Sequence, residues 1–358
     1  MKSVMTCSID MASRAILACI KTKTDKQRAL VPVLVGPPGC GKTEAIFAVA
    51  AQLKALLGED KFKFSYRTTA HDEPSDMAVP YKTDNGKLGH IVAEWLPTDA
   101  GVTRLVALDE LDRTGMQTLN AYLQILHGGY IHGHRIAENV YFVAAMNGST
   151  DTGTTALNGA IRNRVVFIYV DPKRPDFAEG WQDWAAEADV SPEVRAFAQN
   201  HPEALQSGGD YEFEDLAYPS ARATENVDRL RKACANAKFR TDDIEDVLIQ
   251  GVVGNELAVK WRAHKMLVAK APPLADILKD PTGVSLPDDV GVLYTLCMMV
   301  TDHCKSNVTD AKKVLAFIGR LPDEVAAHAA RRLAKRVPAV VGTPEFIKFA
   351  GKVNYLLT

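Results

Sequence analysis

One stretch of this sequence, residues 31–50, narrows the choice of folds more than any other part of the chain. An apolar run at residues 31–35 leads into the segment GPPGCGKT at 36–43, and a helical pattern of apolar residues follows. Glycines let the backbone curl so that successive N–H groups point toward an anion, and the N-terminus of the next helix adds its dipole. This order of strand, loop and helix predicts a phosphate-binding loop in an α/β fold.

Two residues at the end of the loop have the chemistry that a nucleoside triphosphate requires. Lys42 offers a positive charge to the outer phosphates, and Thr43 offers a hydroxyl ligand to Mg²⁺. A plain turn before a core helix is the alternative. It is disfavoured because strand, loop spacing, lysine, threonine and helix all occur together. We therefore expect ATP and Mg²⁺ as ligands.

Polar residues follow two later apolar runs. Asp109 and Glu110 come directly after residues 105–108, and Asn147 follows residues 140–146. Asp109 could hold Mg²⁺, Glu110 could polarise an attacking water, and Asn147 could orient that water against the γ-phosphate. Taken alone, the acidic pair could be a surface turn and the asparagine a cap, but their order after the phosphate loop argues against both. The predicted cofactor-binding residues are Gly36, Pro37, Pro38, Gly39, Cys40, Gly41, Lys42, Thr43, Glu44 and Asp109, and the expected Mg²⁺ ligands are Thr43 and Asp109.

Three arginines are candidates for contact with the transferred phosphate. Arg162 and Arg164 precede a strand-like run at 165–170, and Arg222 begins a helical segment in PSARAT at 219–224. An arginine from a neighbouring subunit often stabilises the charge on a transferred phosphoryl group. Solvated surface arginines are the plain alternative for all three. Arg222 could instead report the nucleotide state by moving a lid.

The pattern of apolar residues divides the chain into an α/β part and a helical part. Strand-like and helical runs alternate up to about residue 170, which predicts a parallel sheet flanked by helices with ligands at the carboxyl ends of the strands. Helical patterns dominate afterwards, and prolines mark two boundaries. We predict a nucleotide-binding α/β core at 1–170, an all-helical lid at 171–270 and a C-terminal helical extension at 271–358.

Composition is that of an ordinary soluble globular protein. The chain has 358 residues, of which 47% are hydrophobic and 24% are charged, and its net charge is −2. This near-neutral charge gives no global field that favours nucleic acid or an anionic membrane. Six cysteines without a C-x-x-C pair indicate reduced thiols in the cytoplasm, and no apolar run is long enough to span a membrane. Cys40 is either a small loop residue or a redox-sensitive thiol.

As an ordered series, these motifs resemble those of the AAA+ ATPases, and more narrowly those of the MoxR branch, in the group that includes the CbbQ-type Rubisco activases. The resemblance covers roughly residues 28–268. The matching segments are GPPGCGKT at 36–43, HDEPSDM at 71–77, LVALDELDR at 105–113, VYFVAAMNGS at 140–149, ALNGAIRNRV at 156–165, PSARAT at 219–224 and GVVGNELAVKW at 251–261.

The resemblance implies a role for each candidate residue. Lys42 and Thr43 would be the Walker A residues, Asp109 and Glu110 Walker B, Asn147 sensor 1, Arg164 the arginine finger, Arg162 a second trans-acting arginine and Arg222 sensor 2, with Arg113 near the subunit boundary. It also implies a homo-oligomeric ring, expected to contain six subunits. The ring would act on a protein client, with any von Willebrand-type adaptor as a separate chain.

Two further segments resemble family features on the axial face of such rings. Residues 71–100 look like the helix-2 insert, and the predicted hairpin at 130–136 looks like the pre-sensor-1 hairpin. Trp95 in the insert could instead be a core residue. His127, His132 and His134 are interpreted as free histidines rather than a metal site. The basic cluster Arg331, Arg332, Lys335 and Arg336 is expected on a solvated helix face, with an acidic partner as the alternative.

Two other functions share the same ATPase residues. The first is an AAA+ machine that works on nucleic acid, such as a helicase loader or a packaging-linked ATPase. The second is a P-loop nucleotide switch or small-molecule kinase that does not form a ring. The near-neutral charge argues against the first, and the sensor-like asparagine and late arginines argue against the second.

Overall fold

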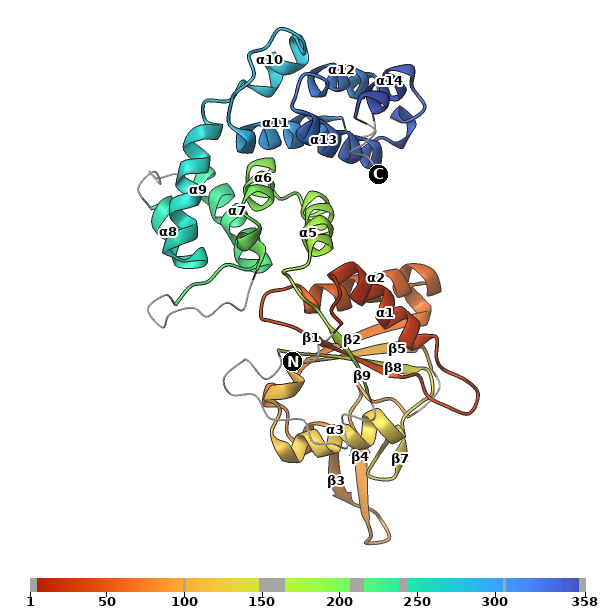
Figure 1. Cartoon of the computed structure of the whole chain (residues 1–358). Coiled ribbons are helices and arrows are strands. Elements are labelled where there is room, and N and C mark those ends of the chain that lie inside the picture. Colours follow the sequence, from red (N-terminus) through yellow and green to blue (C-terminus); the bar gives the residue numbers. More distant parts are fainter. Residues whose placement is uncertain are drawn as a thin grey trace. The chain divides into compact units, whose positions relative to one another are not determined.

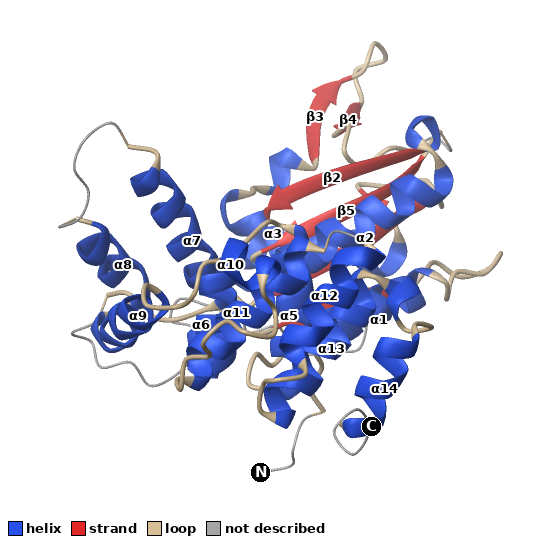
Figure 2. Ribbon diagram, turned by 90° about the horizontal axis from the view of Figure 1, so that it is seen from above, coloured by secondary structure: helices blue, strands red, loops and turns tan. Residues whose placement is uncertain are grey.

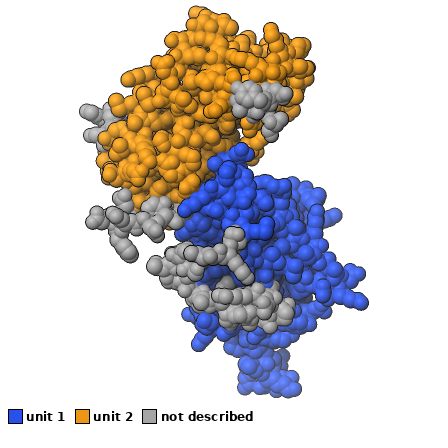
Figure 3. Space-filling view, viewed as in Figure 1, with its two compact units in different colours: residues 1–180 blue, residues 181–358 orange. Residues whose placement is uncertain are grey.

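A computed structural model describes residues 5–98, 101–147, 165–206, 216–237, 244–304 and 307–353, without the side chains of residues 123 and 127. The chain divides into two compact units, residues 1–180 and 181–358 (Figure 3). Each unit is described below by itself.

The first unit is built around a five-stranded parallel sheet in the order β2-β5-β8-β1-β9. The strands are β1 (Val31–Val35), β2 (Phe62–Thr68), β5 (Thr103–Asp109), β8 (Val140–Met146) and β9 (Val165–Tyr169). Because β8 lies between β1 and β5, the residues that follow these three strands meet at one edge of the sheet. Four of these strands were predicted from apolar runs and β2 from the alternation of polar and apolar residues at 61–68, and this sheet confirms the predicted α/β class.

Helices cover both faces of this sheet. Helix α1 (Ile9–Ile20) and helix α2 (Lys42–Leu57) lie over one face, and helix α3 (Met116–Gly128) lies over the other (Figures 1 and 2). Ile46 and Val49, two of the apolar residues of α2 that the sequence places on one face, are fully buried. Short 3-10 turns complete the unit at Glu59–Lys61, Thr69–His71, Pro74–Asp76 and Leu111–Arg113.

Two hairpins extend from the first unit. One joins β3 (Ala78–Lys82) to β4 (Leu88–Val92), and the other joins β6 (Tyr130–Ile131) to β7 (His134–Arg135). The second hairpin was predicted, and its turn at His132 and Gly133 has positive φ angles of 45° and 83°. The β3–β4 hairpin was not predicted from the sequence.

The described part of the second unit is entirely helical. Helix α5 (Pro175–Glu187) crosses the boundary between the units. The other helices are α6 (Pro192–Asn200), α7 (Ala221–Ala235), α8 (Glu245–Val253), α9 (Asn255–Val268), α10 (Leu274–Lys279), α11 (Val290–His303), α12 (Val308–Ile318), α13 (Asp323–Arg336) and α14 (Pro344–Lys352), with 3-10 turns at Pro202–Leu205 and Pro338–Val340. None of the helices in the described ranges is long and apolar enough to cross a bilayer.

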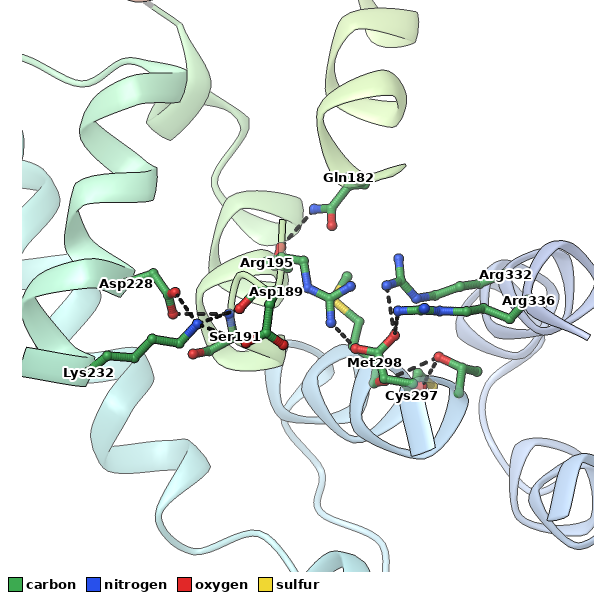
Figure 4. Close-up of polar contacts among 12 residues, drawn as sticks. Gln182, Asp189, Ser191, Arg195, Asp228, Lys232, Cys297, Met298, Arg332 and Arg336 are labelled. Atoms are coloured by element: carbon green, nitrogen blue, oxygen red, sulfur yellow. Dashed lines mark hydrogen bonds and ion pairs between the residues drawn. The ribbon is translucent and has the colours of Figure 1, made fainter. Parts of the chain in front are cut away.

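A charged junction joins α6, α11 and α13 in the second unit. The Asp302 carboxylate on α11 pairs with Arg195 from α6 and with Arg332 and Arg336 from α13, at 3.0 and 2.8 Å for the last two (Figure 4). The side chain of Arg332 is only 10% exposed, so the expectation of a solvated basic face is wrong for this residue. It turns inward because a carboxylate on the neighbouring helix compensates its charge.

Candidate functional site

The phosphate loop, residues 36–43, has the curled backbone that its glycines allow. Gly39 and Gly41 have positive φ angles of 73° and 90°, and Gly41 caps the N-terminus of α2. The Lys42 ammonium group donates hydrogen bonds to the carbonyl oxygens of Gly36 (2.8 Å) and Pro37 (2.9 Å). These bonds hold the positive charge of Lys42 within the loop, at the amino end of α2.

Two predicted site residues converge on the loop from neighbouring strands. Asn147, directly after β8, accepts a hydrogen bond from Lys42 Nζ through its Oδ1 atom at 2.9 Å. Asp109, at the end of β5, accepts a hydrogen bond from Thr43 Oγ1 through its Oδ2 atom at 2.8 Å. The structure therefore brings Lys42, Thr43, Asp109 and Asn147 together, as their order along the chain predicts.

The Asp109 carboxylate is nearly buried, with 9% of the residue exposed, and several donors hold it. Its Oδ1 atom accepts the backbone N–H of Glu110 at 2.9 Å. Its Oδ2 atom accepts the Tyr66 hydroxyl at 2.8 Å in addition to Thr43. Glu110 itself has a left-handed backbone, with φ 58° and ψ 38°, and its side chain lies 3.8 Å from Arg113. Such a conformation is uncommon for a residue other than glycine and is often found at functional sites.

Two residues of the site were not predicted from the sequence. Tyr66 lies on β2, where the register pairs Thr68 with Asp109, so that the period-2 pattern places Tyr66 on the same face as Asp109. Asp112 is fully buried, and its Oδ2 atom accepts the backbone N–H of Asn147 at 3.0 Å. The available signal for Asp112 was a second acid shortly after Asp109.

The three candidate arginines are not among the described residues of the first unit. Arg162 and Arg164 lie outside them. Arg222 is exposed on α7 in the second unit, one residue after the helix begins. Ser220 caps this helix by accepting the backbone N–H of Ala223 at 3.0 Å.

The insert residues contribute to the core of the first unit. Leu96 is 1% exposed, and Trp95 packs beside it while its Nε1 atom donates to the carbonyl oxygen of Asp76 at 3.1 Å. The Arg67 guanidinium lies 4.6 Å from the centre of the Trp95 ring. This packing favours the alternative that Trp95 is a core residue.

Some histidine and cysteine side chains of the first unit make packing contacts or are buried. His132 stacks on His90 with ring centres 4.3 Å apart, which joins the turn of the β6–β7 hairpin to strand β4. Among the described residues, no group of three or more histidine, cysteine, aspartate or glutamate side chains could hold a metal ion. Cys40 is 1% exposed, which favours its interpretation as a small loop residue, and all six cysteines are free thiols.

Comparison with known proteins identifies the part of the chain that contains this site. Residues 32–165 match the family described as the AAA domain of the dynein-related subfamily. This part of the chain is therefore similar to an AAA domain. The matched stretch includes the phosphate loop, Asp109, Glu110 and Asn147. No curated protein matches the chain.

Three solved structures show a weak overall similarity to the chain. NtrX from Brucella abortus is 14% identical with a TM-score of 0.38, and the match covers 93% of this chain and 68% of NtrX. The RuvB Holliday junction branch migration motor from Thermotoga maritima is 13% identical with a TM-score of 0.35, covering 96% and 87%. PCH-2 from C. elegans is 14% identical with a TM-score of 0.32, covering 74% and 62%.

The AAA domain accounts for the arrangement of the first unit. The five-stranded parallel sheet, the phosphate loop after β1 and the helices on both faces agree with the AAA+ α/β fold that the sequence predicts. AAA domains are in general nucleotide-hydrolysing modules. The strand order places the Asn147 amide and the Asp109 carboxylate beside the phosphate loop.

Proposed function

We propose that this protein is an ATP-hydrolysing AAA+ machine of the MoxR type that remodels or assembles a protein client as a homo-oligomeric ring in the cytoplasm. The observation that carries the proposal is the convergence of three strand ends on one loop. Lys42 contacts Asn147, and Thr43 contacts Asp109, at 2.9 and 2.8 Å. A phosphate loop that served only as a turn would not need an amide and a carboxylate aimed at its lysine and threonine.

The donors at this edge of the sheet fit Mg²⁺. The Thr43 hydroxyl and the Asp109 carboxylate are oxygen ligands of the kind that Mg²⁺ prefers, and they lie within hydrogen-bond distance of each other. They would hold the ion, which when bound neutralises charge on the triphosphate. Lys42 and the N–H groups of the loop bind the phosphates, and Glu110 and Asn147 position and polarise the attacking water.

In this proposal two neighbouring subunits share each active site, because one of them supplies the catalytic arginines. Arg164, with Arg162 as a second residue, enters from the neighbouring subunit and stabilises the transferred phosphoryl group, and Arg222 couples hydrolysis to movement of the helical lid. Residues 171–270 form that lid in the proposal, and residues 271–358 form an extension beyond it. The ring contains six subunits, and any von Willebrand-type adaptor is a separate chain.

Substitution of the two central residues separates binding from hydrolysis. Lys42→Ala should abolish binding of a fluorescent ATP analogue, because the positive charge held by the loop carbonyls is lost. Glu110→Gln should keep binding but reduce phosphate release by at least about a hundredfold, since the carboxylate that polarises water is gone. Glu138→Gln, at an exposed carboxylate paired with Arg135, is the matched control and should hydrolyse ATP at the wild-type rate. Wild-type hydrolysis by Glu110→Gln would contradict the proposal.

The same assays on Arg164→Ala test the shared site. This variant should bind ATP nearly as the wild type does but lose hydrolysis, because trans-acting arginines contribute factors of about a thousand or more in rate. Light scattering with and without ATP measures assembly, and a strict monomer in both conditions would favour a nucleotide switch. Stimulation of the ATPase rate by DNA that falls with increasing salt would favour a nucleic-acid substrate instead.

A further inference from the structure

The Asp109 carboxylate is held by three donors from three different elements. The Thr43 hydroxyl from α2 and the Tyr66 hydroxyl from β2 both donate to Oδ2 at 2.8 Å, and the Glu110 backbone N–H donates to Oδ1 at 2.9 Å. Thr69 Oγ1 also donates to the Asp109 carbonyl oxygen at 3.0 Å. The segment around the end of β2 therefore fixes both the backbone and the side chain of Asp109.

Tyr66 occupies a defined place between the sheet and the phosphate-loop helix. Its ring packs against Phe47 of α2, with ring centres 5.3 Å apart. The packing of the ring and the hydrogen bond of the hydroxyl to Asp109 together fix the direction in which the hydroxyl points.

The number of lone pairs on the Asp109 carboxylate limits how many hydrogen bonds each of its oxygens can accept. Each carboxylate oxygen of Asp109 can accept about two hydrogen bonds. The hydroxyls of Thr43 and Tyr66 fill Oδ2, so the remaining acceptor direction lies on Oδ1, beside the Glu110 N–H. A carboxylate fixed in this way would have Oδ1 left to help hold Mg²⁺.

We propose that Tyr66 is a positioning residue that orients the Asp109 carboxylate for Mg²⁺. This inference rests on the proposed function, and it assigns a role to a residue outside the phosphate loop and the strand-end motifs. Tyr66 acts on the metal site through Asp109. Its removal therefore weakens the Mg²⁺-dependent part of nucleotide binding and leaves the metal-free part unchanged.

The test compares Tyr66→Phe with the wild-type chain and with Tyr81→Phe. The control replaces a tyrosine that is 45% exposed on the β3–β4 hairpin and keeps every contact of Asp109. Binding of a fluorescent ATP analogue is measured in EDTA and in a Mg²⁺ titration. We expect Tyr66→Phe to need about threefold to tenfold more Mg²⁺ for half-maximal enhancement of binding, since one hydrogen bond to a charged acceptor is lost.

The conditions of this experiment distinguish a failure of the role of Tyr66 from a failure of the proposed function. Affinity in EDTA should be the same for all three proteins, whereas a loss of fold would lower it in Tyr66→Phe. A wild-type Mg²⁺ titration in Tyr66→Phe would overturn the role of Tyr66 alone. A wild-type chain that binds no nucleotide in either condition would overturn the proposed function and this inference with it.

Discussion

Backbone shape at single positions sets the geometry of the nucleotide site. Gly39 and Gly41 adopt positive φ angles that cost a glycine little, whereas Glu110 adopts one at a cost. The Glu110 backbone N–H donates to the Asp109 carboxylate, and this bond offsets part of the strain. Space is a second constraint on this geometry. A glycine with an ordinary φ angle can still be required where a Cβ atom would collide with a neighbouring atom.

Gly36 is such a position. A Cβ atom there would lie 2.8 Å from the carbonyl oxygen of Val170 and 3.2 Å from Cys40 Sγ. Gly36→Ala should therefore displace the loop from β9 and lower the free energy of unfolding by about 1–3 kcal/mol. Thermal denaturation measures the loss. Gly115→Ala is the matched control, because a Cβ atom there meets nothing within 4 Å. Equal melting temperatures for the two variants would contradict the prediction.

The sequence predicted the residues whose place follows from a motif and missed those whose place follows from strand order. Lys42, Thr43, Asp109 and Asn147 each end or follow a recognisable run, so their meeting could be expected. Tyr66 contributes through the pairing of β2 with β5, which an alternating pattern alone does not specify. The sequence also does not show that Asp112 is buried, because burial depends on packing that the neighbouring residues do not specify.

At the scale of elements, the two hairpins differ in how far the sequence predicts them. The β3–β4 hairpin leaves Val79, Leu88 and Ile91 exposed, at 52%, 72% and 61%, so its strands lack a buried apolar face to reveal them. The pair Asn85–Gly86 at its turn is a signal typical of a tight hairpin. The sequence of this hairpin therefore contains a turn signal but no apolar pattern that predicts its strands.

The junction of α6, α11 and α13 depends on a single carboxylate (Figure 4). Arg195 is 1% exposed, and it shares Asp302 with Arg332. Asp302→Ala should therefore lower the free energy of unfolding by about 3–5 kcal/mol, because two largely buried guanidinium groups lose their partner. Urea denaturation measures this loss.

Asp183→Ala supplies the control for that junction. Asp183 pairs with Lys335 at 2.8 Å, but both side chains are more than half exposed. Exposed pairs contribute about 0–1 kcal/mol, so this variant should unfold nearly as the wild type does. A loss for Asp302→Ala as small as that for Asp183→Ala would show that the junction does not hold the three helices together.

At the scale of the whole chain, the sequence predicted the change from an alternating α/β part to a helical part. It did not predict that α6 and α11 pack together, because they lie on either side of the proline-marked boundary near residue 272. Apolar periodicity indicates which face of a helix is buried but not which helix covers it. The division of the helical part into a lid and an extension remains a prediction.

Two buried histidines give the second unit a pH dependence. Burial lowers the pKa of His264 below its ordinary value of 6.5, and burial together with Arg331 and Lys335 lowers the pKa of His328. Below about pH 6.5 the unfolded chain therefore takes up protons that the folded chain refuses. The free energy of unfolding should fall as the pH drops from 6.5 toward the folded pKa values and should level off above about pH 7. Carboxylates with a lowered pKa, such as Glu203, act at lower pH.

Urea denaturation at pH 7.5 and pH 5.5 measures this dependence through tryptophan fluorescence. Trp261 reports on the region directly, since its ring centre lies 5.8 Å from that of His264. His264→Gln should reduce the difference between the two pH values, because the amide can still donate to the Glu193 carbonyl but does not titrate. His303→Gln replaces an exposed histidine and should keep the full wild-type difference, since that side chain meets water in both states. A protein equally stable at both pH values would show that neither buried ring excludes a proton.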